Sequence, residues 1–229
     1  MENLGGIIFA AVLALDLLLV TSSRLMHCVR IVAVQGVLLG VLPLAAPGAL
    51  TGHIGETVFL AVMTLGIKGV LLPALLRRSI LVVKVRREIE PYVGYSVSAA
   101  IFLAAVGGAF ILCAGLPTPR QLVSPLALPA AFSTVFSGLF MIVTRKKAIT
   151  QTIGFLVFEN GICLFGMGLM LHHGLLVELG ILLDVFVFVF VMGIAVFHIR
   201  RKFQHIDADK LSSLGDMDAV PAEMEADNE

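Results

Sequence analysis

Residues 57–76 read TVFLAVMTLGIKGVLLPALL, a stretch of apolar residues interrupted by one charge, Lys68. A helix of about 20 apolar residues spans the ~30 Å hydrocarbon core of a bilayer, where the backbone must satisfy its own hydrogen bonds. The rest of the 229-residue chain is similar, because 59% of its residues are hydrophobic and its mean hydropathy is +1.01. Soluble domains are only about 45–50% apolar. The composition therefore predicts an all-α integral membrane protein.

Seven stretches meet the length and polarity requirements of a transmembrane helix. They are residues 4–21, 31–50, 57–76, 92–116, 127–144, 150–171 and 175–199. Fourteen of the 16 basic residues follow the first, third, fifth or seventh stretch, whereas Arg120 lies in the other set of loops and Lys68 inside a span. By the positive-inside rule, the N-terminus is outside and the C-terminus cytoplasmic. Six or eight spans would scatter these charges over both faces, so we expect seven, in the inner (cytoplasmic) membrane of the cell.

Three ionisable side chains fall near the middle of a predicted span: Lys68 in the third, Glu159 in the sixth and Asp184 in the seventh. Each costs about 2.5–3.5 kcal/mol on insertion scales, so such residues usually face the bundle interior or a wet cavity. Desolvation brings the proton affinities of carboxylates and amines closer together, which favours proton exchange between them. We therefore predict a proton relay. The alternative is a static ion pair between Lys68 and one carboxylate that holds the helices in register.

A proline follows Lys68 by just over one helical turn. Pro73 cannot donate a hydrogen bond to the carbonyl of Gly69, so we expect an irregular helix there. A helix break beside an intramembrane charge favours a hydrated site, although an ordinary kink is the alternative explanation.

Other polar residues rank lower as relay candidates. Asp16 lies nearer the cytoplasmic end of its span, where we expect it to reach interfacial water or Arg24. His172 and His173 at the outer end of the sixth span, with Glu178 at the start of the seventh, are either an exit for protons or solvated loop residues.

Small residues predict close helix packing at two places. Gly36 and Gly40 form a G-x-x-x-G pair on the second span, and Ala104 and Gly108 form a similar pair on the fourth.

Two stretches suggest an internal repeat. VTSSRLMHCVRIVAVQGVLLG, from Val20, and VTRKKAITQTIGFLVFENGICLFG, from Val143, share a V-T start, a basic loop and a glycine-containing helix. With one gap, Gln35 aligns with Glu159, which makes Gln35 a further candidate. Spans one to three and five to seven would then be parallel three-helix units joined by the fourth span, although similar composition also explains the match.

The predicted organisation has four parts. It comprises a three-helix unit (1–90), a linking helix (91–124), a second three-helix unit (125–202) and a disordered acidic cytoplasmic tail (203–229).

The segment GFLVFENGICLFGMG (154–168) followed by ELGILLDVFVFVFVMGIAVFHIRRKF (178–203) resembles membrane component E of the hydrogenase-4 family. That family belongs to group 4 membrane hydrogenases and formate hydrogenlyases. Its C-terminal part is similar to the three-helix K subunit of respiratory complex I and the C subunit of multisubunit cation/proton antiporters. The resemblance implies that Glu159 and Asp184 lie on a lateral ion path, whereas the role of Lys68 rests on the physical argument.

The resemblance also implies an assembly with antiporter-like membrane subunits and a hydrogenase module. The [NiFe] centre and iron–sulfur clusters are expected in those partner subunits and not in this chain, which has three scattered cysteines and no nucleotide-binding loop. We expect phospholipid contacts along the basic loops and no nucleic acid. The chain would be a non-catalytic subunit that carries protons or sodium ions. The alternatives are a stand-alone secondary transporter and a purely structural linker.

Overall fold

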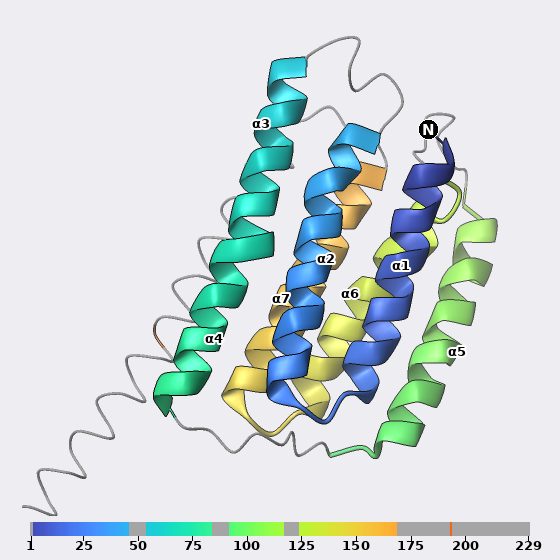
Figure 1. The fold of residues 1–229 in the computed structure, drawn as a ribbon. Helices are drawn as coiled ribbons and strands as arrows, with labels where there is room; N and C mark the ends of the chain where they lie inside the picture. Colours follow the sequence, from blue (N-terminus) through green and yellow to red (C-terminus); the bar gives the residue numbers. More distant parts are fainter. Residues whose placement is uncertain (1, 46–53, 84–91, 117–123, 169–192, 194–229) are drawn as a thin grey trace, which may run out of the picture.

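The computed structural model describes residues 2–45, 54–83, 92–116, 124–168 and 193, and its elements in these ranges are helices (Figure 1). They are α1 (Glu2–Thr21), α2 (Leu25–Ala45), α3 (Ile54–Thr64), the π-helical segment η1 (Leu65–Leu71), α4 (Leu72–Val83), α5 (Tyr95–Ala114), α6 (Ala127–Thr144) and α7 (Ala148–Gly168). Within the described ranges, six stretches are long and apolar enough to cross a membrane, with α3, η1 and α4 forming one of them. The prediction of an all-helical, multi-pass membrane protein is confirmed at this level. The seventh stretch, 175–199, lies outside the described residues apart from Gly193 and stays a prediction.

The second and third spans differ in extent from the sequence prediction. The helix α2 begins at Leu25 and ends at Ala45, whereas the hydropathy pattern placed this span at residues 31–50. The third span continues to Val83 instead of ending at residue 76. Both differences have the same cause, because Arg30, Arg77 and Arg78 are exposed residues inside helices. Long basic side chains lie along an apolar helix with their charges in water, so a charge does not mark the helix end.

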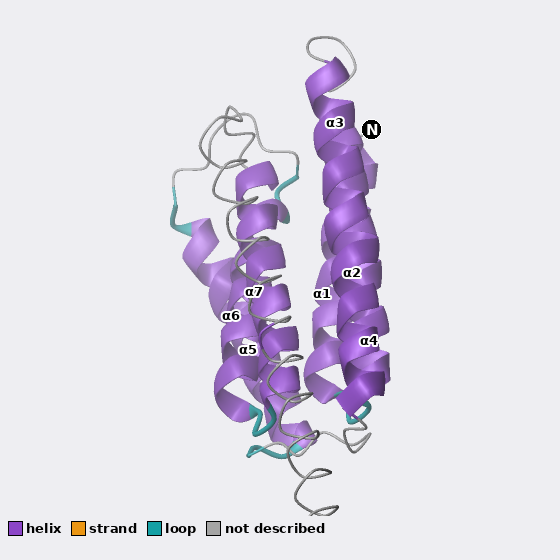
Figure 2. Ribbon diagram, turned by 90° about the vertical axis from the view of Figure 1, so that its left-hand side faces the viewer, coloured by secondary structure: helices purple, strands orange, loops and turns teal. Residues whose placement is uncertain are grey.

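The helices form two layers (Figure 2). One layer contains α1, α2 and the α3–η1–α4 rod, and the other contains α5, α6 and α7. Contacts between α1 and α6 and between α2 and α7 join the layers, while α5 packs against α1 and α6. This arrangement brings α2 and α7 together at the centre of the bundle, next to η1.

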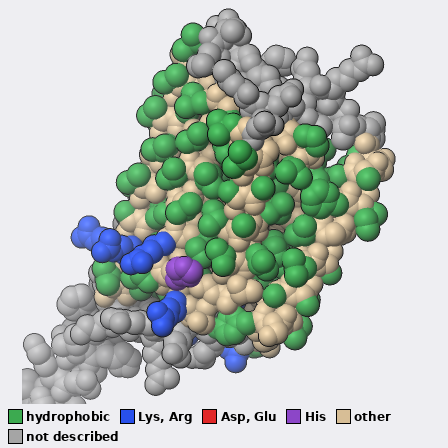
Figure 3. Space-filling model, turned by 45° about the vertical axis from the view of Figure 1, so that its right-hand side comes forward, with side chains coloured by type: hydrophobic (Ala, Val, Ile, Leu, Met, Phe, Trp, Pro, Cys, Tyr) green, Lys and Arg blue, Asp and Glu red, His purple; other side chains and the backbone are tan. Residues whose placement is uncertain are grey.

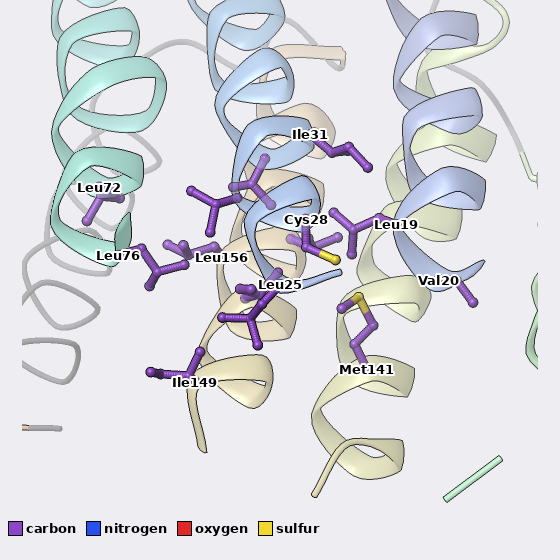
Figure 4. Packing of buried hydrophobic residues seen from close by; sticks show 14 of the residues in the cluster. Leu19, Val20, Leu25, Cys28, Ile31, Leu72, Leu76, Met141, Ile149 and Leu156 are labelled. Carbon is purple, nitrogen blue, oxygen red and sulfur yellow. The ribbon is translucent and has the colours of Figure 1, made fainter. Parts of the chain in front are cut away.

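Two apolar clusters close the bundle at its two ends. One contains residues from the ends of α1, α4 and α6 and the starts of α2 and α7, including Val20, Leu25, Leu76, Met141 and Ile149 (Figure 4). The other cluster contains residues from the starts of α1 and α6 and the ends of α2 and α7. Its members include Phe9, Leu42, Ala130 and Leu164. On α1, α2, α6 and α7, the buried residues Asp16, Gln35, Thr134 and Glu159 lie in sequence between members of the two clusters.

The outer surface is apolar along the bundle and basic at one end (Figure 3). Large side chains such as Ile111 and Val143 are 78% and 76% exposed. Soluble monomers rarely expose apolar patches of more than a few hundred Å², so this surface suits hydrocarbon. Apart from the buried Lys68, the described basic residues follow α1, lie on α2 or α4, or follow α6. The cluster around Met141 contains residues from all four of these helices, so the basic residues lie at the same end of the bundle.

The helix irregularity expected beside Pro73 is present as η1. Leu72 donates its backbone N–H to the carbonyl of Ile67, five residues earlier, as in a π-helix. Pro73 follows directly and has no N–H to restore the α-helical pattern. Lys68 lies in the middle of this segment and is buried, whereas Arg77 and Arg78 of the same span are exposed, so the widened turn carries the buried charge.

Glycines allow the central helices to approach each other closely. A Cβ at Gly36 would overlap the backbone of Lys68, and a Cβ at Gly40 would lie 2.7 Å from Cβ of Leu65. The predicted G-x-x-x-G contact is therefore confirmed, and its partner is η1. The corresponding prediction for Ala104 and Gly108 is wrong within the described residues. A Cβ at Gly108 would meet nothing within 4 Å and Ala104 is exposed, because α5 packs through a different face.

Candidate functional site

A buried ion pair joins η1 to α7. Lys68 Nζ lies 2.9 Å from Glu159 Oε1, and the two side chains are only 6% and 2% exposed. Both charged residues thus face the bundle interior, as expected for intramembrane charges. Glu159 is in the middle of α7, on the order of 16 Å along the helix from its start at Ala148. The pair therefore lies near mid-depth in the apolar part of the bundle.

The close contact between α2 and η1 explains how Lys68 reaches α7. Gly36 has no side chain, so the backbone at Lys68 packs directly on α2. Neighbouring glycines continue this packing, because Gly69 lies against Val37. A larger residue at Gly36 would move η1 away from the bundle centre and lengthen the distance from Lys68 to Glu159.

A second group of buried polar side chains lies on α1, α2, α6 and α7. Gln35 Nε2 donates a hydrogen bond of 2.8 Å to Asp16 Oδ1. Thr134 Oγ1 lies 2.6 Å from Asp16 Oδ2 and 2.9 Å from the carbonyl oxygen of Ala130. Asn160 Nδ2 approaches Gln35 Oε1 at 3.5 Å. Since Asn160 follows Glu159 directly, α7 connects this group to the ion pair.

The two groups form one polar layer between the apolar end clusters. Asp16 lies between Val12 and Leu19 of α1, which belong to opposite clusters, and Gln35 lies likewise between Val32 and Leu39 of α2. Polar groups removed from water are stabilised when they bond to each other, and such networks favour one arrangement of the helices. The layer can therefore hold protons or charges inside an otherwise apolar bundle.

The structure corrects the expected position of Asp16. Its side chain is fully buried, so it reaches neither interfacial water nor Arg24. The residue is five positions from the end of α1, but helical side chains point toward the N-terminus, which moves the carboxyl deeper into the bundle. Gln35, expected only from the repeat, is its direct partner.

Sequence reasoning missed Thr134 and gave Asn160 no role. Hydroxyl residues are common in membrane helices and usually bond to their own backbone, as Ser133 does to the carbonyl of Pro129. A threonine on α6 therefore carried no signal of a contact with α1. Asn160 does differ from its apolar neighbours, and an amide next to Glu159 was the available clue.

Arg145 also differs from its expected role as a loop charge. It follows α6 and is buried, and its Nη2 donates a hydrogen bond of 2.7 Å to the carbonyl of Val20 near the end of α1. The last carbonyls of a helix have no partner within the helix, so this bond completes α1. Burial lowers the pKa of the Arg145 guanidinium, and the adjacent Tyr95 opposes that shift. The residue thus joins α1 to α6 at the basic end.

Four predicted residues lie outside the described residues: Asp184, His172, His173 and Glu178. Their roles stay predictions.

The helices, the apolar outer surface and the internal ion pair define a class, the multi-pass helical membrane proteins with paired charges in the bundle interior. Within it, the chain belongs to the family of the uncharacterized protein Rv0085 of Mycobacterium tuberculosis. The two are 32% identical over 213 residues, which cover 93% of this chain and 94% of the relative. No family model matches the chain. No solved structure matches it either.

Proposed function

We propose that the chain is a membrane-arm subunit of a complex I-like assembly, an energy-converting [NiFe] hydrogenase or formate hydrogenlyase, and that it takes part in moving protons or sodium ions. The observation that carries this proposal is the buried ion pair between Lys68 and Glu159. Glu159 lies in the segment that resembles membrane component E of the hydrogenase-4 family, where the matching carboxylate is on a lateral ion path. Its contact with Lys68 adds a second group that can exchange a proton with it.

The surroundings of the pair favour a changeable interaction. A π-helical turn around Lys68 leaves backbone groups less regularly bonded than an α-helix does, and such turns are frequent at functional sites. Burial between apolar clusters keeps water scarce, so a proton that leaves Glu159 needs a specific acceptor. We infer that Asp184 provides the next carboxylate toward a neighbouring subunit.

The charge distribution supports an orientation. The basic helix ends would face the cytoplasm by the positive-inside rule, with seven spans and an outside N-terminus. Arg77 and Arg78, exposed on α4, would contact anionic phospholipid headgroups or an extramembrane subunit in the inner (cytoplasmic) membrane. The redox chemistry would belong to partner subunits with the [NiFe] centre and iron–sulfur clusters, so this subunit itself would be non-catalytic.

A structural linker is the second candidate, and the same ion pair favours it. A direct bond of 2.9 Å between two helices can hold them in register without exchanging protons. Removing the charges would stop ion translocation if the pair is a relay. If the pair is only structural, translocation would continue as long as the complex assembles.

Purification and an activity assay together test the proposal. An affinity tag on the chain, expressed from its native locus, should co-purify hydrogenase-like and antiporter-like subunits in mild detergent. In vesicles containing that assembly, Glu159→Gln should lower ion translocation at least tenfold while hydrogen-dependent electron transfer continues. The matched control is Glu225→Gln, the same change in the acidic C-terminal segment, which should have no effect. Purification of the chain alone, or full translocation by the Glu159→Gln assembly, would contradict the proposal.

A further inference from the structure

Asp16 differs from Glu159 in having no cation as its partner within the described residues. Its hydrogen-bond partners there are the amide of Gln35 and the hydroxyl of Thr134, both neutral. An isolated ionised carboxylate is far more costly to remove from water than a neutral carboxyl, and Asp16 is fully buried in a bundle with an apolar surface. Among the described residues, Asp16 is therefore a buried carboxyl group without a counter-charge.

The charged groups on the surrounding helices do not change this assignment. Arg145 contacts α1 at the carbonyl of Val20, one turn beyond Asp16, and lies beside Tyr95. Lys68 bonds to Glu159 on the far side of α2 and α7. On α2, His27 and Arg30 are exposed. The remaining described titratable groups on α2, α5 and α7 are Cys28, Cys113 and Cys163.

The number of hydrogens available around Thr134 favours a proton on Asp16. The hydroxyl of Thr134 has one hydrogen, but it lies within bonding distance of two oxygens, Asp16 Oδ2 and the carbonyl of Ala130. If Asp16 were ionised, both oxygens would be acceptors and would share that one hydrogen. If Asp16 Oδ2 carries a proton, it donates to Thr134, and Thr134 donates to Ala130. The separation of 2.6 Å suits an O–H···O bond in either direction, so the distance is compatible with a proton on Asp16, and the hydrogen count favours it.

The hydrogen bonds of Gln35 and Asn160 run in the same donor-to-acceptor direction. Gln35 donates through Nε2 to Asp16 Oδ1, and Gln35 Oε1 faces the Nδ2 group of Asn160. With a neutral Asp16, every contact from Asn160 to the carbonyl of Ala130 has one donor and one acceptor. Hydrogen bonds that run in one direction polarise and strengthen each other.

We propose that Asp16 is a proton-binding site, held as a neutral carboxylic acid that donates a hydrogen bond from Oδ2 to Thr134. Loss of this proton would turn the Thr134 hydroxyl from Ala130 to Asp16, so the site has two hydrogen-bond arrangements. The bundle then contains two carboxyl groups in different states, Glu159 paired with a cation and Asp16 neutral. Only the use of the Asp16 proton in translocation rests on the proposed function, because the site itself needs no partner subunit.

Infrared spectroscopy of the full-length chain in lipid nanodiscs tests this site. At neutral pH, the wild-type chain should show the C=O stretch of a protonated carboxyl, which shifts in D₂O. Carboxyl-labelled ¹³C-aspartate should move this band. Because Asp184 is a second aspartate in a predicted span, Asp16→Asn should abolish the labelled band in a chain that also has Asp184→Asn. Glu159→Gln and the matched control Asp184→Asn should keep it.

Four results would overturn the proposal. Three concern the labelled band: its absence in the wild-type chain, its persistence in the Asp16→Asn, Asp184→Asn double variant, and its loss in Asp184→Asn alone. The fourth is a band that appears only when sodium is removed, because Asp16 would then bind a cation as a carboxylate. If Asp16→Asn fails to fold, the ¹³C-aspartate shift in the Asp184→Asn chain replaces it. If Glu159→Gln does not lower translocation, the proposed function fails but the Asp16 band is unaffected. The two proposals can therefore fail separately.

Discussion

Removing both charges of the Lys68–Glu159 pair separates a relay from a static contact. Lys68→Met and Glu159→Gln each remove one charge with little change in size, and the double variant removes both. Each single variant removes one member of the buried ion pair and leaves the charge of the other, whereas the double variant leaves two neutral side chains in contact. We therefore expect the double variant to be more stable than either single variant.

The size of the effect follows from the burial of the pair. Breaking a buried ion pair by removing one partner costs about 3–5 kcal/mol, and we expect the lower end because the remaining group can neutralise itself. At roughly 2–4 °C per kcal/mol for a chain of this size, each single variant should lose about 6–12 °C in Tm. The double variant should be destabilised by at least 3 kcal/mol less than the sum of the single variants.

Two assays are needed on the same variants. The chain contains no tryptophan, so thermal unfolding in detergent is followed with a thiol-reactive dye that reaches the buried Cys28 and Cys113 only on unfolding. Ion translocation is measured in vesicles containing the full assembly. A relay requires that the double variant assembles and still fails to translocate.

Two outcomes would refute this reasoning. Translocation by the double variant at the wild-type rate would show that the pair is structural. Unchanged Tm values in both single variants would show that Lys68 and Glu159 do not form a buried pair at all.

Three further predictions concern packing, helix shape and topology. In the same thermal assay, Gly36→Val should destabilise the chain by about 1–3 kcal/mol, because its side chain would overlap the η1 backbone. Its control, Gly108→Val, meets no described residue and should change stability by less than about 0.5 kcal/mol. Pro73→Ala supplies the missing N–H, so it should raise Tm but lower translocation, and unchanged translocation would rule out a role for the π-helical turn. Single cysteines at Arg86 and Lys146, in a cysteine-free chain, should react with an impermeant thiol reagent from the same side of the membrane; labelling from opposite sides would refute the topology.

The general architecture was predictable from the sequence because it depends on hydropathy and length. Residues 127–144 match α6 at both ends. Helix ends with arginines were misplaced by six residues at Leu25 and by seven at Val83, because a hydropathy window treats a snorkelling side chain as polar. The packing role of Gly36 followed from spacing, but the same rule found no helix against Gly108 in the part of the chain that the structure describes. Spacing shows that a helix can be approached closely and does not show whether another helix is present.

The candidate site was predictable in part. A charge in an apolar stretch is visible in the sequence, so Lys68 and Glu159 were identified before their contact was known. Asp16 was visible too, but its depth depends on the helices that cover it, and Thr134 is an ordinary residue until α6 lies against α1.

The sequence by itself determined that this chain is a helical membrane protein with a few costly charges in its spans. Local composition suffices for that, since a lipid environment requires continuous apolar helices. Only the tertiary structure decided that Lys68 pairs with Glu159, 91 positions away, and that Asp16 instead meets neutral partners. The reason is that partner choice depends on which helix faces meet, and those faces are set by glycine contacts and by the π-helical turn, which act between helices and not along them.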